Sequence, residues 1–240
     1  MKSFRTLLIP SVAFSVLSLG CGMQKPLFPV HADTKTPLQI VLEQLDAASK
    51  SFKNAQADVL SDVYTRSIKA HDTEPGSIYV ERSGSSTSMG AITLDPGTKA
   101  PSKIVSFANG LFQLYTPGTN QVDVFKANAS QAKYDSFLTL GFGGSGTDLA
   151  KNWTINDQGP ETIDGVKTEK LDLVSKDPSV LSTFTHVTIW VDPTRGVSLK
   201  QIFYAPNGDN RTATYTNIKL NSSINKKPYA ISSKATRINH

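Results

Sequence analysis

Six segments rich in Val, Ile, Thr, Phe and Tyr, separated by short turns, constrain the fold of this chain more than any other feature. The turns carry Asn-Gly, Pro-Gly, Thr-Arg-Gly or Pro-Asn-Gly-Asp, which are typical of tight connections between strands. Because parallel neighbours need a long crossover, strands joined by such turns run antiparallel. We therefore predict a many-stranded antiparallel sheet that includes residues 77–83, 103–116, 121–127, 186–192, 197–205 and 211–220.

The strands carry apolar side chains on both faces of the predicted sheet. Phe112 and Leu114 alternate onto one face, whereas Leu111 and Tyr115 alternate onto the other. A sheet with water on one side would alternate apolar and polar residues more regularly. Two interpretations stay open: helices cover one face and side chains fill the other, or the sheet curls into a partial barrel whose concave face binds an apolar ligand.

An amphipathic helix is predicted ahead of the strands. Residues 36–52 place apolar side chains at helical spacing, with Thr36 available as the N-cap and Pro37 at the first helical position. Such an apolar stripe is typical of contact with a core. Together with the strands, this helix predicts an α+β fold.

The strand pattern is absent from residues 134–151. Residues 134–140 suit a short helix, the glycine run from Gly141 to Gly146 ends it, and a second helix begins with Thr147 or Asp148 as its cap. The run matches the dinucleotide-binding pattern G-x-G-x-x-G, but that motif must follow a strand inside a parallel β-α-β unit. In antiparallel surroundings we interpret it as a connection and expect no cofactor.

The first 32 residues have the layout of a signal peptide. Lys2 and Arg5 precede a mostly apolar stretch over residues 7–19, and cleavage after Ala32 would leave residues 33–240 as a single domain. These 32 residues hold three of the 25 Lys and Arg residues and none of the 20 Asp and Glu residues, so the remainder is close to neutral. We expect an exported protein that does not bind nucleic acid.

Cys21 offers a different maturation. The sequence Ser-Leu-Gly-Cys approaches a lipobox, in which the cysteine is lipidated, although Ser18 occupies the place of an aliphatic residue. Lipidation at Cys21 would anchor the protein in the cell envelope, whereas cleavage after Ala32 would release it. Since Cys21 is the only cysteine, disulfides and zinc-thiolate sites are excluded.

Patterns for catalysis are missing from the sequence. No G-x-S-x-G nucleophile motif occurs, and His71, His186 and His240 are far apart without the spacing of a metal-binding pair. We therefore expect neither an enzyme nor a metal site.

Two longer stretches carry a family resemblance. Residues 103–127 resemble a strand pair of the bacterial outer-membrane lipoprotein carrier (LolA-like) family, and residues 189–224 resemble its aromatic-Asp, turn and Thr- and Tyr-rich strand pattern. The resemblance extends from about Leu38 to the segment Ile-Asn-Lys-Lys-Pro-Tyr-Ala-Ile near the C-terminus. It implies an incomplete antiparallel β-barrel closed by helices acting as a lid, here residues 36–52 and 134–151, over a hydrophobic cavity for acyl chains.

The resemblance also implies site residues. In the family an arginine in a motif like W-V-K-R-P bonds the lid and helps to switch the cavity, and Arg82 in Tyr-Val-Glu-Arg-Ser matches it, with Ser83 in place of proline. The alternative for Arg82 is a solvated strand residue paired with Glu81 or a neighbouring carboxylate. We expect the acyl cavity to be lined by Ile78, Val80, Phe112, Leu114, Ile189, Val191, Leu199 and Phe203.

The predicted function is an exported, non-enzymatic, monomeric carrier of acylated lipoprotein or phospholipid in the periplasm. The resemblance further implies an inner-membrane release complex and an outer-membrane acceptor as partners. Two alternatives remain: an envelope lipoprotein of the same fold, anchored at Cys21, that accepts or senses lipid, and a ligand-free β-rich interaction module.

Overall fold

The computed structural model describes residues 35–84, 86–126 and 140–240. The predicted signal peptide, Cys21 and the predicted helix over 134–140, except for its last residue, lie outside these ranges.

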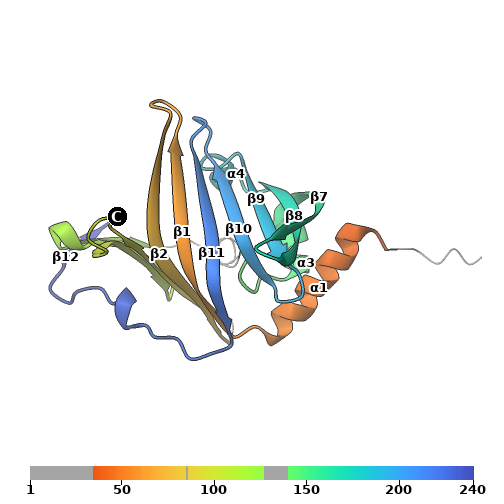
Figure 1. The fold of residues 1–240 in the computed structure, drawn as a ribbon. Helices are drawn as coiled ribbons and strands as arrows, with labels where there is room; N and C mark the ends of the chain where they lie inside the picture. The colour runs from red at the N-terminus through yellow and green to blue at the C-terminus, as the bar shows by residue number, and fades with distance from the viewer. Residues whose placement is uncertain (1–34, 85, 127–139) are drawn as a thin grey trace, which may run out of the picture. The chain divides into compact units, whose positions relative to one another are not determined.

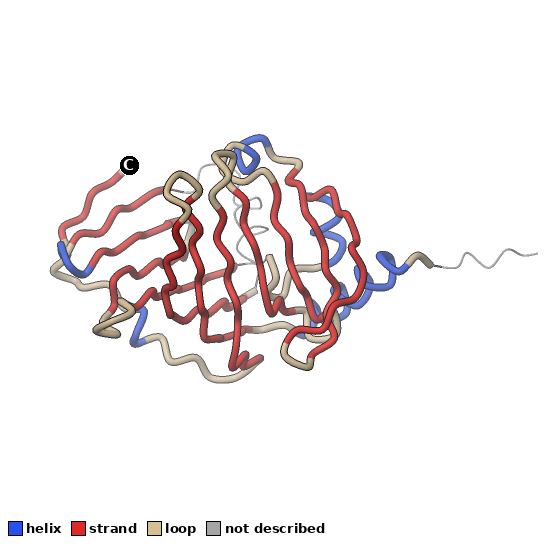
Figure 2. The backbone as a smooth tube through the Cα atoms, turned by 45° about the horizontal axis from the view of Figure 1, so that its top comes forward, coloured by secondary structure: helices blue, strands red, loops and turns tan. Residues whose placement is uncertain are grey.

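The described residues form a twelve-stranded sheet. Its strands are β1 (Asn54–Thr65), β2 (Ala70–Ser83), β3 (Ser86–Leu94), β4 (Pro101–Ala108), β5 (Leu111–Thr116), β6 (Gln121–Lys126), β7 (Trp153–Ile163), β8 (Val166–Ser175), β9 (His186–Asp192), β10 (Val197–Tyr204), β11 (Asn210–Leu220) and β12 (Thr236–Asn239). They are ordered β12-β6-β5-β4-β3-β2-β1-β11-β10-β9-β8-β7. Figures 1 and 2 show that the sheet is strongly curved, and its two edges, β12 and β7, do not pair with each other. The predicted incomplete antiparallel barrel is confirmed.

The pairing departs from the prediction at one edge. β12 pairs in parallel with β6, whereas the other neighbours are antiparallel. The stretch 221–235 between β11 and β12 is long enough to carry the chain to the far edge, where a short turn would have forced an antiparallel pair. At the opposite edge, the register of β7 shifts between Asp157 and Pro160.

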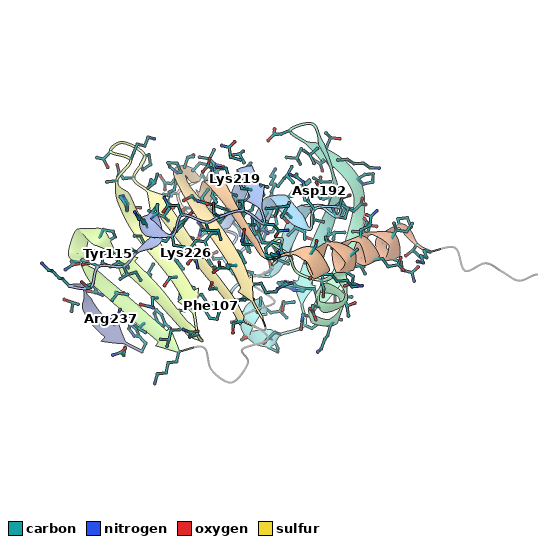
Figure 3. The ribbon with its side chains drawn as sticks, turned by 90° about the horizontal axis from the view of Figure 1, so that it is seen from below. Phe107, Tyr115, Asp192, Lys219, Lys226 and Arg237 are labelled. Carbon is teal, nitrogen blue, oxygen red and sulfur yellow. The ribbon has the colours of Figure 1, made fainter. Side chains whose placement is uncertain are left out.

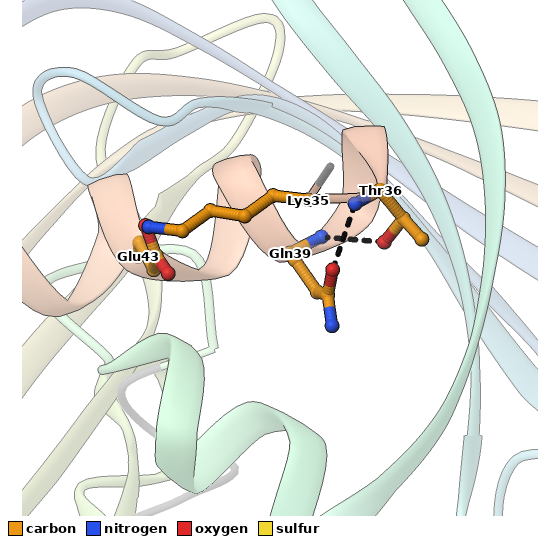
Figure 4. Close-up of polar contacts among 4 residues, drawn as sticks. All are labelled: Lys35, Thr36, Gln39 and Glu43. Carbon is orange, nitrogen blue, oxygen red and sulfur yellow. Dashed lines mark hydrogen bonds and ion pairs between the residues drawn. The ribbon is translucent and has the colours of Figure 1, made fainter. Parts of the chain in front are cut away.

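Helix α1 (Pro37–Ser51) confirms the predicted N-terminal helix. The Gln39 backbone N–H donates to Thr36 Oγ1 at 3.2 Å, and the Thr36 N–H donates to Gln39 Oε1 at 2.7 Å (Figure 4). This capping box satisfies two backbone donors that the first helical turn leaves free. The Lys35 ammonium, just ahead of the N-cap, lies 2.6 Å from the Glu43 carboxylate of the helix and forms an exposed ion pair with it.

Helix α3 (Gly146–Asn152) begins earlier than predicted. Its N-cap is Ser145, whose Oγ accepts from Asp148 N at 3.0 Å, so the prediction of Thr147 or Asp148 as the cap was wrong. Thr147 bonds α1 instead, donating through its backbone N and its Oγ1 to the Asp46 carboxylate at 2.9 and 2.8 Å. A Cβ on Gly146 would lie 2.0 Å from the Leu42 carbonyl oxygen, so glycine lets the two helices approach closely.

The two faces of the sheet are covered differently. α1 and α3 pack on one face, called here the inner face, where Val41 and Leu45 of α1 join buried residues of β8 and β9. The short helices are α4 (Pro178–Leu181), η1 (Pro117–Thr119) and η2 (Lys227–Tyr229). On the outer face, Tyr229 of η2 packs on strands β2 to β6. Figure 3 labels a buried residue of each face, Phe107 inside and Tyr115 outside.

Candidate functional site

A cavity of about 450 Å³ opens on the inner face. Its wall runs across the sheet from β5 to β10, strands that are separated by five others in the sheet order, so the sheet must curve toward this face. The volume lies in the range of small-molecule sites. The apolar residues of the wall are Val59, Pro75, Ile78, Met89, Ala91, Ile92, Val105, Phe112, Leu114, Leu140, Phe142, Phe184, Phe203 and Ala213.

The polar groups deep in the cavity bond one another. The Gln201 amide donates to the Leu140 carbonyl at 2.8 Å, and the Tyr215 hydroxyl donates to Gln201 Oε1 at 2.9 Å. Burial raises the pKa of the Tyr215 phenol, so this hydroxyl stays a neutral donor. Phe142 and Tyr215 are both buried and pack edge-to-face with ring centroids 4.9 Å apart, which closes this end. The deep end therefore suits an apolar group.

Charged residues stand at the other end of the wall. Arg211 is exposed, and its guanidinium donates to the hydroxyl of the buried Ser61 at 3.0 Å. Glu74 and Lys103 also border the cavity. The site is thus polarised along its length, apolar inside and charged at the rim.

Four of the eight predicted lining residues border this cavity: Ile78, Phe112, Leu114 and Phe203. Val80 belongs to the same apolar cluster as Ile78 but is 1% exposed and is not part of the cavity wall.

The other three predicted lining residues lie elsewhere. Ile189 and Val191 are buried against α1 and α3, where they border a void of only about 30 Å³. Leu199 is buried at a register shift between Ser198 and Lys200 and is not on the cavity wall. The bulge at this position interrupts the alternation on which its prediction rested.

Sequence reasoning missed wall residues on β1, β3 and β11. Val59, Met89 and Ala91 lie on strands that were not among the predicted segments, because β1 and β3 are rich in small and polar residues. The available signal was the two-residue spacing of Ala57, Val59 and Ser61, which places all three on one face.

Arg82 connects the sheet to the helical layer. Its guanidinium donates to the Ser49 carbonyl of α1 at 3.0 Å and to the Gly143 carbonyl before α3 at 2.6 Å, and it lies 5.4 Å from the centroid of the Phe52 ring. Glu81 pairs with Lys226 rather than with Arg82. The ion pairs among the described residues do not include Arg82, so the alternative of a solvated pair with Glu81 or a neighbouring carboxylate does not describe this site.

The three histidines among the described residues lie outside the cavity wall. His71 contacts Asp62 at 2.9 Å and His240 contacts Asp123 at 3.0 Å, whereas His186 lies 3.9 Å from Asp172. Within the described ranges, no three His, Cys, Asp or Glu residues gather in a way that could hold a metal ion. The helices of those ranges are too short or too polar to cross a membrane.

Known proteins resemble this chain in structure rather than in sequence. No family model and no curated protein matches it. A solved structure of an uncharacterized conserved protein from Thermus thermophilus has a TM-score of 0.53 at 11% identity, and the alignment covers 85% of this chain and 100% of the other.

Two further matches have lower TM-scores. A LolA superfamily protein from Nitrosomonas europaea aligns over 82% of this chain and 98% of its own, with 14% identity and a TM-score of 0.39. The Mycobacterium tuberculosis lipoprotein LppX aligns over 78% of this chain and 97% of its own, with 14% identity and a TM-score of 0.46. The TM-score of 0.53 shows that the chain shares its fold with the Thermus thermophilus protein, and this fold is the incomplete barrel that the LolA-like resemblance predicts.

Proposed function

We propose that this protein is an exported carrier that binds acyl chains of lipoproteins or lipids in the inner-face cavity. In this proposal it moves them across the periplasm toward the outer membrane. The observation that supports it is the apolar wall, with Ile78, Phe112 and Leu114 only half-buried. Each methylene that leaves water contributes about 0.8 kcal/mol, so such a wall binds an acyl chain with few polar contacts.

Release is the second requirement of a carrier. Arg82 bonds both the end of α1 and the loop before α3, so breaking its bonds would free the helical layer from β2. We propose Arg82 as the switch between a closed and an open cavity, with α1 and α3, which here cover β8 and β9 beside the cavity, as the lid. Contacts that the lid gives up on opening would lower the net affinity for cargo.

The remaining parts of the proposal concern the cellular setting. We propose one non-enzymatic, monomeric domain over residues 33–240, loaded by an inner-membrane release complex and unloaded at an outer-membrane acceptor. The mass of the native N-terminus separates cleavage after Ala32 from lipidation at Cys21. A lipidated Cys21 would favour the anchored acceptor or sensor over the shuttle.

Native mass spectrometry of the protein purified from its own envelope without detergent tests the proposal. We expect an acylated adduct, identified by lipid extraction. Ala91→Trp would fill the cavity, because Ala91 lies on its wall, and should remove the adduct. Ala230→Trp is the matched control, since Ala230 is exposed away from the cavity. A protein that stays free of ligand when offered triacylated peptide and phospholipid would overturn the proposal.

A further inference from the structure

We infer that the cavity selects an anionic amphiphile, with the negative headgroup bound by Arg211 and the acyl chain in the apolar end. The inference rests on the proposed function and narrows its cargo to lipids with a carboxylate or phosphate head. An uncharged acylglyceryl group would offer the guanidinium ester carbonyls but no negative charge.

The placement of Arg211 at the rim follows from strand alternation. Arg211, Ala213 and Tyr215 occupy alternate positions of β11 and all border the cavity. Tyr215 marks the closed end beside Phe142, and Arg211 lies four residues away, about 13 Å at roughly 3.3 Å per residue. An acyl chain extending from the headgroup at Arg211 would therefore run along apolar wall toward Phe142.

The guanidinium of Arg211 is oriented but not neutralised. Ser61 is 3% exposed and accepts from Nη2 at 3.0 Å, which fixes the side chain over the wall. None of the ion pairs among the described residues involves this guanidinium. An arginine carries five N–H donors in a planar fork, so donors remain for a bidentate carboxylate or phosphate.

The other charged residues on the described wall are Lys103 and Glu74. Glu74 faces Ser61 in the β1–β2 register, so it lies two strands from Arg211. Two cations against one carboxylate leave this end of the cavity with a positive balance. Glu74 opposes an anionic head, and its removal should strengthen the binding of an anion but not of a neutral amphiphile.

Paired ligands test the inference on the purified, delipidated protein. Palmitic acid is compared with methyl palmitate, and phosphatidic acid with diacylglycerol, by titration calorimetry. We expect each acid to bind about tenfold more tightly than its neutral partner, as for a hydrogen-bonded charge. The stronger of the two acids identifies whether carboxylate or phosphate is the preferred head.

Three variants assign the preference to the rim. Arg211→Gln should remove the preference for the acids over their neutral partners and leave the affinity for the neutral ligands unchanged. Glu74→Gln should increase the preference for the acids. Lys219→Gln, on the same strand but away from the cavity wall, is the matched control and should bind like the parent protein. Equal binding of charged and neutral ligands, or a preference that survives Arg211→Gln, would overturn the inference alone. Binding of neither kind would overturn the proposed function with it.

Discussion

The inner face of the sheet contains two regions with the same strand pattern and different contents. Under α1 and α3, Leu171 and Val187 are fully buried in a dense apolar cluster, and we call this region the covered half. Around the cavity, Ile78 and Leu114 stay half-buried, and we call this region the open half. The comparison teaches that apolar alternation marks the inner face of such a sheet, while the docking of a helix decides which part of that face is filled by the protein itself.

The largest expected effect is a difference between the two halves in how much a side-chain truncation lowers the free energy of unfolding. Leu171→Ala should lower the free energy of unfolding by about 3 kcal/mol, because it leaves a void in packed surroundings. Leu114→Ala borders an existing cavity and should cost less than about 1 kcal/mol. Urea denaturation of the delipidated protein measures both. Equal losses would show that the open half is as tightly packed as the covered half.

A second prediction concerns the junction between the halves. Gly143 has φ +72°, and a Cβ there would lie 2.3 Å from the Phe52 ring. Gly143→Ala should cost about 2 kcal/mol through backbone strain and this clash. Gly165→Ala is the control, since its φ of +79° is similar but nothing lies within 4 Å, and it should cost about 1 kcal/mol. Thermal unfolding of both variants gives the difference, and identical losses would contradict a tight junction.

The third prediction concerns Arg82 and the local opening of α1 relative to the sheet. Arg82→Gln removes hydrogen bonds to Ser49 and Gly143 and should cost about 1.5 kcal/mol. Amide hydrogen exchange should accelerate in the last turn of α1 and stay unchanged in β8. Arg237→Gln, whose parent side chain bonds Gln113 at an exposed edge, should have little effect. Uniform acceleration across the sheet would mean that Arg82 supports the whole fold rather than the junction.

The smallest expected effect is a pH dependence at the margin of the covered half. Burial, together with a hydrogen bond to Asp157, raises the pKa of Glu169. The folded protein thus favours the protonated carboxyl, and this contribution to stability is present below the unfolded pKa of about 4.3 and disappears as the pH rises through the raised value. Between about pH 4 and neutrality, Glu169→Gln should therefore lose less stability than the parent protein. Melting temperatures of both proteins at about pH 4 and at neutral pH measure this difference. An identical pH profile would contradict it.

The elements that the sequence predicts correctly depend on local chemistry. The helix over 36–52 is confirmed because Thr36 and Pro37 begin it through contacts within one turn. The predicted strands are aromatic and β-branched and are joined by short turns. By contrast, β7 and β8 were not predicted, because β7 alternates many polar residues and contains Gly159 and Pro160.

The site is less predictable than the fold because long-range contacts decide it. Residues far apart in the sequence, Asp46 and Thr147, bond α3 to α1 over the covered half. No local sequence pattern predicts that α1 and α3 dock there. Ile189 and Phe203 therefore look alike in the sequence, although the helices cover Ile189 and Phe203 faces the cavity. Arg82 was found through a family resemblance, whereas the orientation of Arg211 by Ser61 becomes visible only when β1 and β11 are paired.

The irregular edge at β7 bears on how the protein behaves at high concentration. The edge strand of an open sheet has unpaired backbone N–H and C=O groups, which can pair with the edge strand of another copy. Pro160 has no backbone N–H, and the register shift beside it bends the edge, so a continuous ladder with another chain cannot form along β7. The protein can thus reach high concentrations without forming polymers through β7, although its barrel is not closed.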